Sequence, residues 1–97
     1  MFVLVTYDVS TVTTAGRRRL RRVAKACLDY GQRAQNSVFE GQVDPARFAE
    51  LKGRLLDIYE PQQDSLRFYF MGKNWRRRVE HYGAKPTVDV QRDALIV

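Results

Sequence analysis

The sequence predicts an α+β domain in which two helices cover one face of an antiparallel sheet. Three observations point to this fold class. A chain of 97 residues has room for one hydrophobic core. Its apolar residues alternate between strand-like and helical spacing, in the order strand, helix, strand region, helix, strand. This is the order of a split βαβ unit, so we expect a single domain over residues 1–97.

The first element is a strand over residues 2–9, which are apolar and β-branched, as in a central strand buried on both faces. Near its end stands one carboxylate, Asp8. Since successive side chains of a strand point to opposite faces, the sheet should separate Tyr7 from Asp8. We expect Asp8 to emerge at the end of the strand, close to the loop and helix that follow.

The second element is a helix. Thr13 or Thr14 in a threonine-rich loop can cap its N-terminus, and Gly31 provides its C-terminal stop. Its apolar residues share one stripe at helical spacing: Leu20, Val23, Ala24, Cys27 and Leu28. Cys27, the only cysteine, should therefore be a packed core residue that forms no internal disulfide.

Basic side chains are concentrated on the rest of this helix. Residues 17–25 carry six of them and no acidic residue, and residues 73–78 carry four. At about 100° per residue, Arg17 and Arg19 fall at the rims of the apolar stripe. The outward-facing members are Arg18, Arg21, Arg22 and Lys25. With a net charge of +6 and a pI near 9.9, the chain should bind a polyanion through these clusters; a solvated basic face is the alternative.

A strand region follows over residues 33–43, and a break near Asn36-Ser37 divides it into two short strands. Asp44 as N-cap and Pro45 in the first turn then begin a second helix, which ends before Pro61. The apolar residues of this helix are Phe48, Leu51, Leu55, Ile58 and Tyr59.

The remaining segments predict further strands. Residues 65–71 alternate and are rich in aromatics, and residues 77–82 can pair back on them as a weaker strand. Phe68 and Phe70 share a face, which favours core packing over the stacking of RNA bases. The tail 83–97 ends in an apolar segment that should pair with a sheet, and a second copy of the chain would cover the open face.

Asp8 is the strongest candidate for chemistry. A carboxylate beside a basic helix suits a phosphodiester, because the carboxylate can hold a divalent metal while arginines hold phosphates. Metal-dependent phosphodiesterases need several carboxylates, and Asp29 and Glu40 should lie elsewhere. A two-fold axis that brings Asp8 to its own copy would supply the second one. The alternative is that Asp8 caps a loop or pairs with Arg17 or Arg19.

Several classes of function are disfavoured. The only histidine, His81, is expected on the surface of an edge strand, and the sequence has no zinc motif or phosphate-binding P-loop. No apolar run approaches the roughly 20 residues of a membrane span. Met1 leads directly into a strand without a signal peptide, so we expect a cytoplasmic protein that does not bind membranes.

Three motifs together resemble a known family. They are Tyr7-Asp8-Val9 at a strand end, Arg17-Arg18-Arg19-Leu20, and Gln35-Asn36-Ser37-Val38-Phe39-Glu40 preceded by Tyr30-Gly31 and Arg33. This pattern resembles the small CRISPR-associated endoribonuclease family, the smaller of the two proteins that insert new spacers into CRISPR arrays. The resemblance extends essentially from end to end of the chain.

The resemblance implies a ferredoxin-like homodimer whose last strand, within the tail 83–97, packs on the neighbour's sheet. It implies that Asp8 and Tyr7 are catalytic and that Asp8 binds Mg²⁺ opposite its own copy. Together with the basic clusters, it predicts these nucleic-acid-binding residues: Arg17, Arg18, Arg19, Arg21, Arg22, Arg33, Phe39, Arg76, Arg77 and Arg78. The implied partners are duplex DNA, single-stranded RNA as the other substrate, and the larger CRISPR integrase, whose dimers such proteins bridge.

The family includes both nucleases and scaffolds, so the sequence leaves the cleavage activity open. Two other functions also stay open: a stand-alone, toxin-like endoribonuclease of related fold, and a non-enzymatic RNA-binding module.

Overall fold

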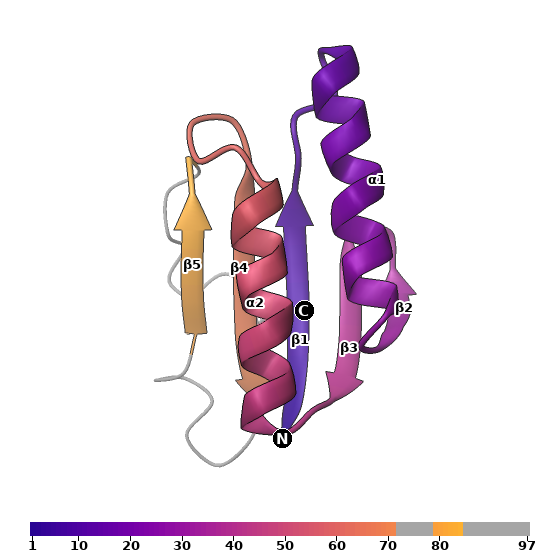
Figure 1. Ribbon diagram of the computed structural model, residues 1–97, viewed down its shortest axis with the longest axis vertical. Coiled ribbons are helices and arrows are strands. Elements are labelled where there is room, and N and C mark those ends of the chain that lie inside the picture. Colours follow the sequence, from indigo (N-terminus) through magenta and orange to yellow (C-terminus); the bar gives the residue numbers. More distant parts are fainter. Residues whose placement is uncertain (72–78, 85–97) are drawn as a thin grey trace.

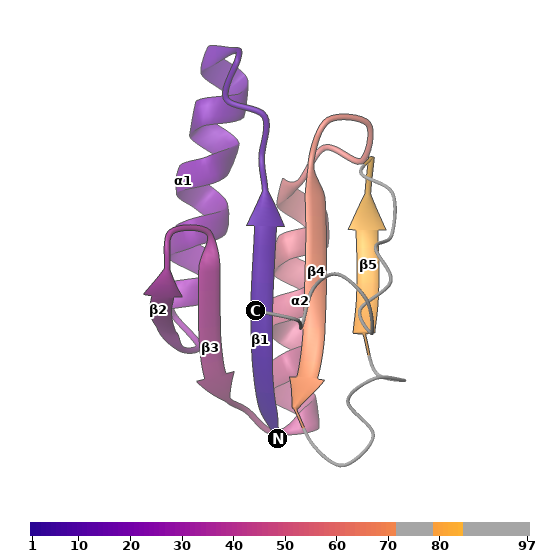
Figure 2. The same ribbon diagram turned by 180° about the vertical axis from the view of Figure 1, so that it is seen from behind.

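The computed structural model describes residues 1–71 and 79–84 and confirms the predicted α+β fold. Its elements are β1 (Phe2–Asp8), α1 (Thr14–Leu28), β2 (Gln32–Gln35), β3 (Val38–Gln42), α2 (Pro45–Ile58), β4 (Ser65–Met71) and β5 (Val79–Gly83). The strands form one antiparallel sheet in the order β2-β3-β1-β4-β5. Both helices lie on one face of it (Figure 1), and the opposite face carries no described helix (Figure 2).

Strand β1 is central, as predicted, between β3 and β4. Its burial alternates, however: Val3, Val5 and Tyr7 are buried in the core with the helices, whereas Phe2 and Leu4 are only half-buried on the other face. The prediction of a strand buried on both faces was therefore wrong for the described chain, because the two helices cover one face alone.

Helix α1 begins at the predicted cap. The Oγ1 atom of Thr13 accepts a hydrogen bond from the Gly16 N–H at 3.0 Å. Val23 and Cys27 are buried as expected, but Leu28 is 50% exposed, which contradicts its place on the apolar stripe. Leu28 lies about 100° around the helix from Cys27, at the edge of the stripe, and so turns away from the sheet.

Helix α2 also begins where predicted, since Asp44 Oδ1 accepts from the Arg47 N–H at 2.7 Å. The ring of Phe48 meets Phe68 and Phe70 edge to face, with centroids 5.4 and 4.9 Å apart. Both β4 rings therefore belong to the core, as expected from their alternation.

The strand region breaks in two as predicted. Ser37, between β2 and β3, adopts a φ of 63°, and the hairpin register shifts between Arg33 and Gln35. The weaker strand is present as β5, whose described part begins at Val79. The predicted Arg76, Arg77 and Arg78, and the tail beyond Ala84, lie outside the described residues. Among the described helices, neither is long and apolar enough to cross a membrane.

Candidate nucleic-acid interface

Asp8 occupies the C-terminal end of β1, on the face of the sheet away from the helices. It is exposed, whereas the preceding Tyr7 is buried on the helix side, so the sheet separates the two side chains as predicted. In the β1–β4 pairing, Asp8 lies opposite Ser65. The first turns of α1 project beyond this same end of the sheet (Figure 1). The fold therefore brings an exposed carboxylate and an arginine-rich helix start to one end of the molecule.

Arg17 lies over the loop that joins β1 to α1. Its Nη1 donates to the Thr11 carbonyl at 3.2 Å and its Nη2 to Thr14 Oγ1 at 3.0 Å. The residue is nevertheless exposed. Both of its partners are neutral, so the positive charge of the guanidinium is available to a phosphate that approaches the helix start.

Arg19 has a different environment, because its guanidinium binds a buried carboxylate. Nε donates to Asp64 Oδ2 at 2.8 Å and Nη2 donates to Asp64 Oδ1 at 3.2 Å, which makes the pair bidentate. The Asp64 side chain is 0% exposed and that of Arg19 is 16% exposed. Arg19 thus reaches across to the loop before β4, where it binds a carboxylate other than Asp8.

Asp64 was absent from the sequence prediction. Burial alone would raise the pKa of its carboxyl, but the hydrogen bond and charge of Arg19, with backbone N–H groups of Glu60 and Ser10, lower the pKa overall. The hydrogen bond to Asp64 correspondingly raises the pKa of Arg19. In sequence Asp64 is one acid in a polar loop, and its partner is 45 residues away, so no local signal identifies it.

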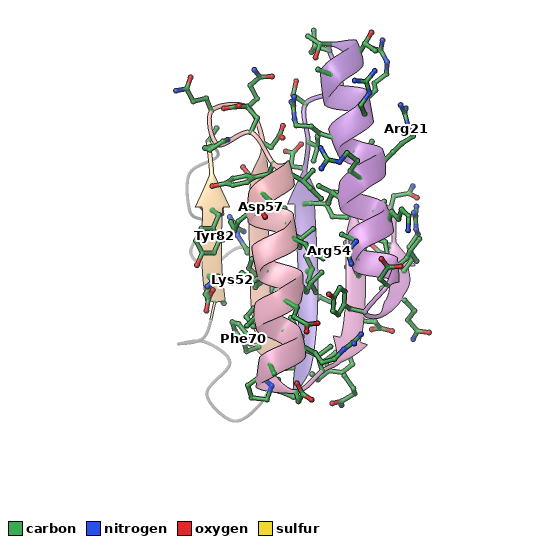
Figure 3. All side chains as sticks on the ribbon, in the orientation of Figure 1. Arg21, Lys52, Arg54, Asp57, Phe70 and Tyr82 are labelled. Atoms are coloured by element: carbon green, nitrogen blue, oxygen red, sulfur yellow. The ribbon has the colours of Figure 1, made fainter. Side chains whose placement is uncertain are left out.

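The other arginines of α1 are exposed, as predicted: Arg18, Arg21 and Arg22. Figure 3 shows Arg21 projecting outward from the helix. Lys25, one turn further on, approaches Asp29 at 3.9 Å with its side chain largely exposed. These cations form a continuous solvent-facing arc, which can contact a phosphate backbone without reading bases.

Tyr7, Arg33 and Phe39 form a second group on the helix side of the sheet. The rings of Tyr7 and Phe39 stack with centroids 5.9 Å apart, and the Arg33 guanidinium lies 5.4 Å from the Phe39 centroid. Burial raises the pKa of the Tyr7 hydroxyl. Tyr7 is therefore a core residue on the helix side of β1, on the face opposite Asp8. Arg33 is the exposed member of this group.

The described residues include no group of three or more carboxylate, histidine or cysteine side chains that could hold a metal ion. Asp29 pairs with Arg54 at 3.0 Å, and Glu40 accepts from Gln32 at 3.1 Å, so both lie elsewhere as expected. One described chain thus does not fit a complete Mg²⁺ site, which needs further oxygen ligands besides Asp8.

Two other predictions can be compared with the structure. Cys27 is buried, and burial raises the pKa of its thiol to about 12, as expected for a core cysteine. His81 is half-buried rather than on the surface, because the neighbouring strand β4 places Arg67 beside it. The Arg67 Nη2 lies 3.2 Å from His81 Nδ1.

Comparison with known proteins shows what this chain is similar to. The family model described as CRISPR associated protein Cas2 matches residues 1–79. The CRISPR-associated endoribonuclease Cas2 3 of Rhodospirillum rubrum is 67% identical over 94 residues, 97% of this chain and 99% of the relative. The CRISPR-associated endonuclease Cas2 of Halalkalibacterium halodurans is 52% identical over 99% of both chains. The crystal structure of Streptococcus pyogenes Cas2 is 64% identical with a TM-score of 0.70, over 86% of this chain and all of the other.

Proposed function

This chain belongs to the CRISPR associated protein Cas2 family, and we propose that it acts in CRISPR adaptation as a homodimer that binds duplex DNA. The observation that carries the proposal is the juxtaposition of exposed Asp8 with the arginine-rich start of α1 at one end of the sheet. The exposed arginines would neutralise phosphates along a duplex, and the larger integrase would hold the same DNA from either side. Because contacts between arginines and phosphates carry no sequence information, such a surface would suit DNA of any sequence.

The proposal includes a weak phosphodiesterase activity on single-stranded RNA or duplex DNA. The curated relatives are named endoribonuclease and endonuclease, which supports this class of reaction. Since one described chain does not complete a Mg²⁺ site, the dimer would have to supply Asp8 twice across its axis. Arg17 and its neighbours would bind the phosphates on either side of the scissile bond.

A scaffold without cleavage activity is the second candidate. The described residues favour it, because they include no group of three or more potential metal ligands, and metal-dependent hydrolysis of a phosphodiester uses several. In that case the integrase would supply all chemistry, and this chain would contribute DNA binding alone.

The experiment that separates the two compares wild type, Asp8→Asn and the matched control Asp57→Asn, an exposed aspartate on α2 (Figure 3). Cleavage of labelled RNA and duplex DNA is measured with and without Mg²⁺, and DNA affinity is measured in parallel. We expect Asp8→Asn alone to lose cleavage while keeping its affinity. Cleavage that survives in Asp8→Asn would exclude the proposed site, and tight binding without cleavage by wild type would establish the scaffold.

A further inference from the structure

Asp64 connects four segments of the chain at the end of the sheet where Asp8 lies. Its carboxylate accepts hydrogen bonds from the Ser10 N–H at 3.0 Å, from the Glu60 N–H at 2.9 Å, and from the Arg19 guanidinium. Its carbonyl accepts from the Ala84 N–H at 3.0 Å. The β1–α1 loop, helix α1, the α2–β4 loop and the end of β5 therefore meet at one buried residue.

Two of these connections lead to Asp8. Ser10 is two residues beyond Asp8, so its bond to Asp64 fixes the backbone on the C-terminal side of the carboxylate. Ser65, the neighbour of Asp64 in sequence, is the cross-strand partner of Asp8 in the β1–β4 register. Asp64 thus restrains Asp8 both through the loop that follows it and through the strand beside it.

The geometry of Arg19 fits this restraint and differs from that of a phosphate ligand. A bidentate bond to a carboxylate that is 0% exposed uses Nε and Nη2, one of the two edges through which a guanidinium binds a phosphate, and Nη2 also donates to Gln63 Oε1 at 3.3 Å. Releasing that edge would leave a charged carboxylate buried without its counterion, which is strongly unfavourable. Arg18, on the same turn, is exposed and has no such bond among the described residues.

We propose that Arg19 and Asp64 are positioning residues that hold the loop after Asp8, and that Arg19 is not one of the residues that bind the nucleic-acid backbone. The part that concerns cleavage rests on the function proposed above. The part that concerns binding does not, because it assigns a role to one arginine of the basic helix whatever the bound polyanion is used for.

The binding test compares Arg19→Gln with the matched control Arg18→Gln, using a labelled DNA duplex over a series of salt concentrations. The slope of log K against log salt should fall by about 0.9 for each phosphate that Arg18→Gln no longer neutralises. In Arg19→Gln the slope should equal that of wild type. A slope that falls in Arg19→Gln as much as in Arg18→Gln would overturn the proposal.

The positioning test follows amide hydrogen exchange at Ser10. Because the Ser10 N–H donates to a charged acceptor, its exchange in Arg19→Gln and Asp64→Asn should be faster by about tenfold or more, and unchanged in Arg18→Gln. Arg19→Lys is the variant to use if either neutral substitution fails to fold. A lysine keeps the charge but cannot form the bidentate pair, so Ser10 should still exchange faster than in wild type. Wild-type exchange in Arg19→Lys would contradict a positioning role.

Cleavage kinetics provide the last comparison. If Asp64 positions Asp8, Asp64→Asn should lower kcat about 10- to 100-fold with little change in KM, because the substrate-binding arginines are intact. A raised KM with unchanged kcat would show instead that the pair contributes to binding. Should wild type bind DNA without cleaving it, the nuclease part of the proposed function fails, whereas the salt slopes and Ser10 exchange still decide the role of Arg19.

Discussion

The exposed arc of α1 makes a quantitative prediction about salt dependence. Arg18 and Arg21 both face solvent, and neither has a carboxylate partner among the described residues. If each of these two arginines contacts one phosphate, the double variant Arg18→Gln/Arg21→Gln should lower the slope of log K against log salt by about 1.8 for one chain. When both α1 helices of a dimer meet the same duplex, the fall should be about 3.6, which over a fourfold range of salt is roughly a hundredfold difference in affinity.

The assay is fluorescence anisotropy of a labelled duplex between 50 and 200 mM salt, on the order of the range in which such contacts are measured. The control is Arg47→Gln with Arg54→Gln, which removes the same charge from α2. Arg54 pairs with Asp29 at 3.0 Å, and the Arg47 guanidinium lies 4.6 Å from the Tyr30 ring centroid. The control should therefore bind with the wild-type slope if the duplex lies at the start of α1.

Two results would refute this reasoning. An unchanged slope in the α1 variant would show that its arginines form a solvated face and bind no phosphate. Equal decreases in slope in the α1 and α2 variants would show a diffuse effect of net charge, without a defined path for the duplex.

Three further predictions concern stability, reactivity and assembly. The lowered pKa of Asp64 contributes stability above the unfolded value near 3.8, and this contribution is lost as the pH falls through the folded pKa. Urea unfolding from pH 7 to 2 should therefore show a smaller acid-dependent loss in Asp64→Asn than in wild type. Cys27, with a thiol pKa of about 12, should resist iodoacetamide at pH 8 until the chain is unfolded. The proposed homodimer would cover the sheet face opposite the helices, where Leu4 is half-buried. Leu4→Asp should therefore give a monomer by light scattering, whereas Leu28→Asp on the exposed end of α1 should not, and a dimeric Leu4→Asp would contradict a dimer formed through this face.

Local signals in the sequence were sufficient for the elements. Thr13 and Asp44 cap the two helices because a side-chain oxygen near a helix start satisfies a free N–H, and this depends on neighbouring residues alone. The placement of Tyr7 and Asp8 on opposite faces of the sheet was also predictable, because successive side chains of a strand point to opposite faces.

The missing parts of the prediction depend on contacts distant in sequence. The sequence analysis grouped Arg19 with the other nucleic-acid-binding arginines of the helix. Helical spacing gives the angle of a side chain around the helix axis, but it does not identify the residue that the side chain contacts. Only the folded chain places Asp64, from the loop before β4, within 2.8 Å of it. His81 was assigned to the surface for the same reason, as Arg67 beside it comes from another strand.

The described ion pairs bear on how the proposed binding and cleavage would follow one another. Away from the start of α1, two of the described cations pair with carboxylates: Arg54 with Asp29 at 3.0 Å, and Lys52 with Glu80 at 2.7 Å. Such pairs cancel at a distance, whereas Arg18 and Arg21 near Asp8 are exposed and have no carboxylate partner among the described residues. A polyanion bound by these arginines would place its phosphates beside Asp8. This binding does not need the second carboxylate that cleavage would need. Under the proposed function, one chain therefore supplies phosphate-binding arginines, whereas hydrolysis depends on what a second copy contributes.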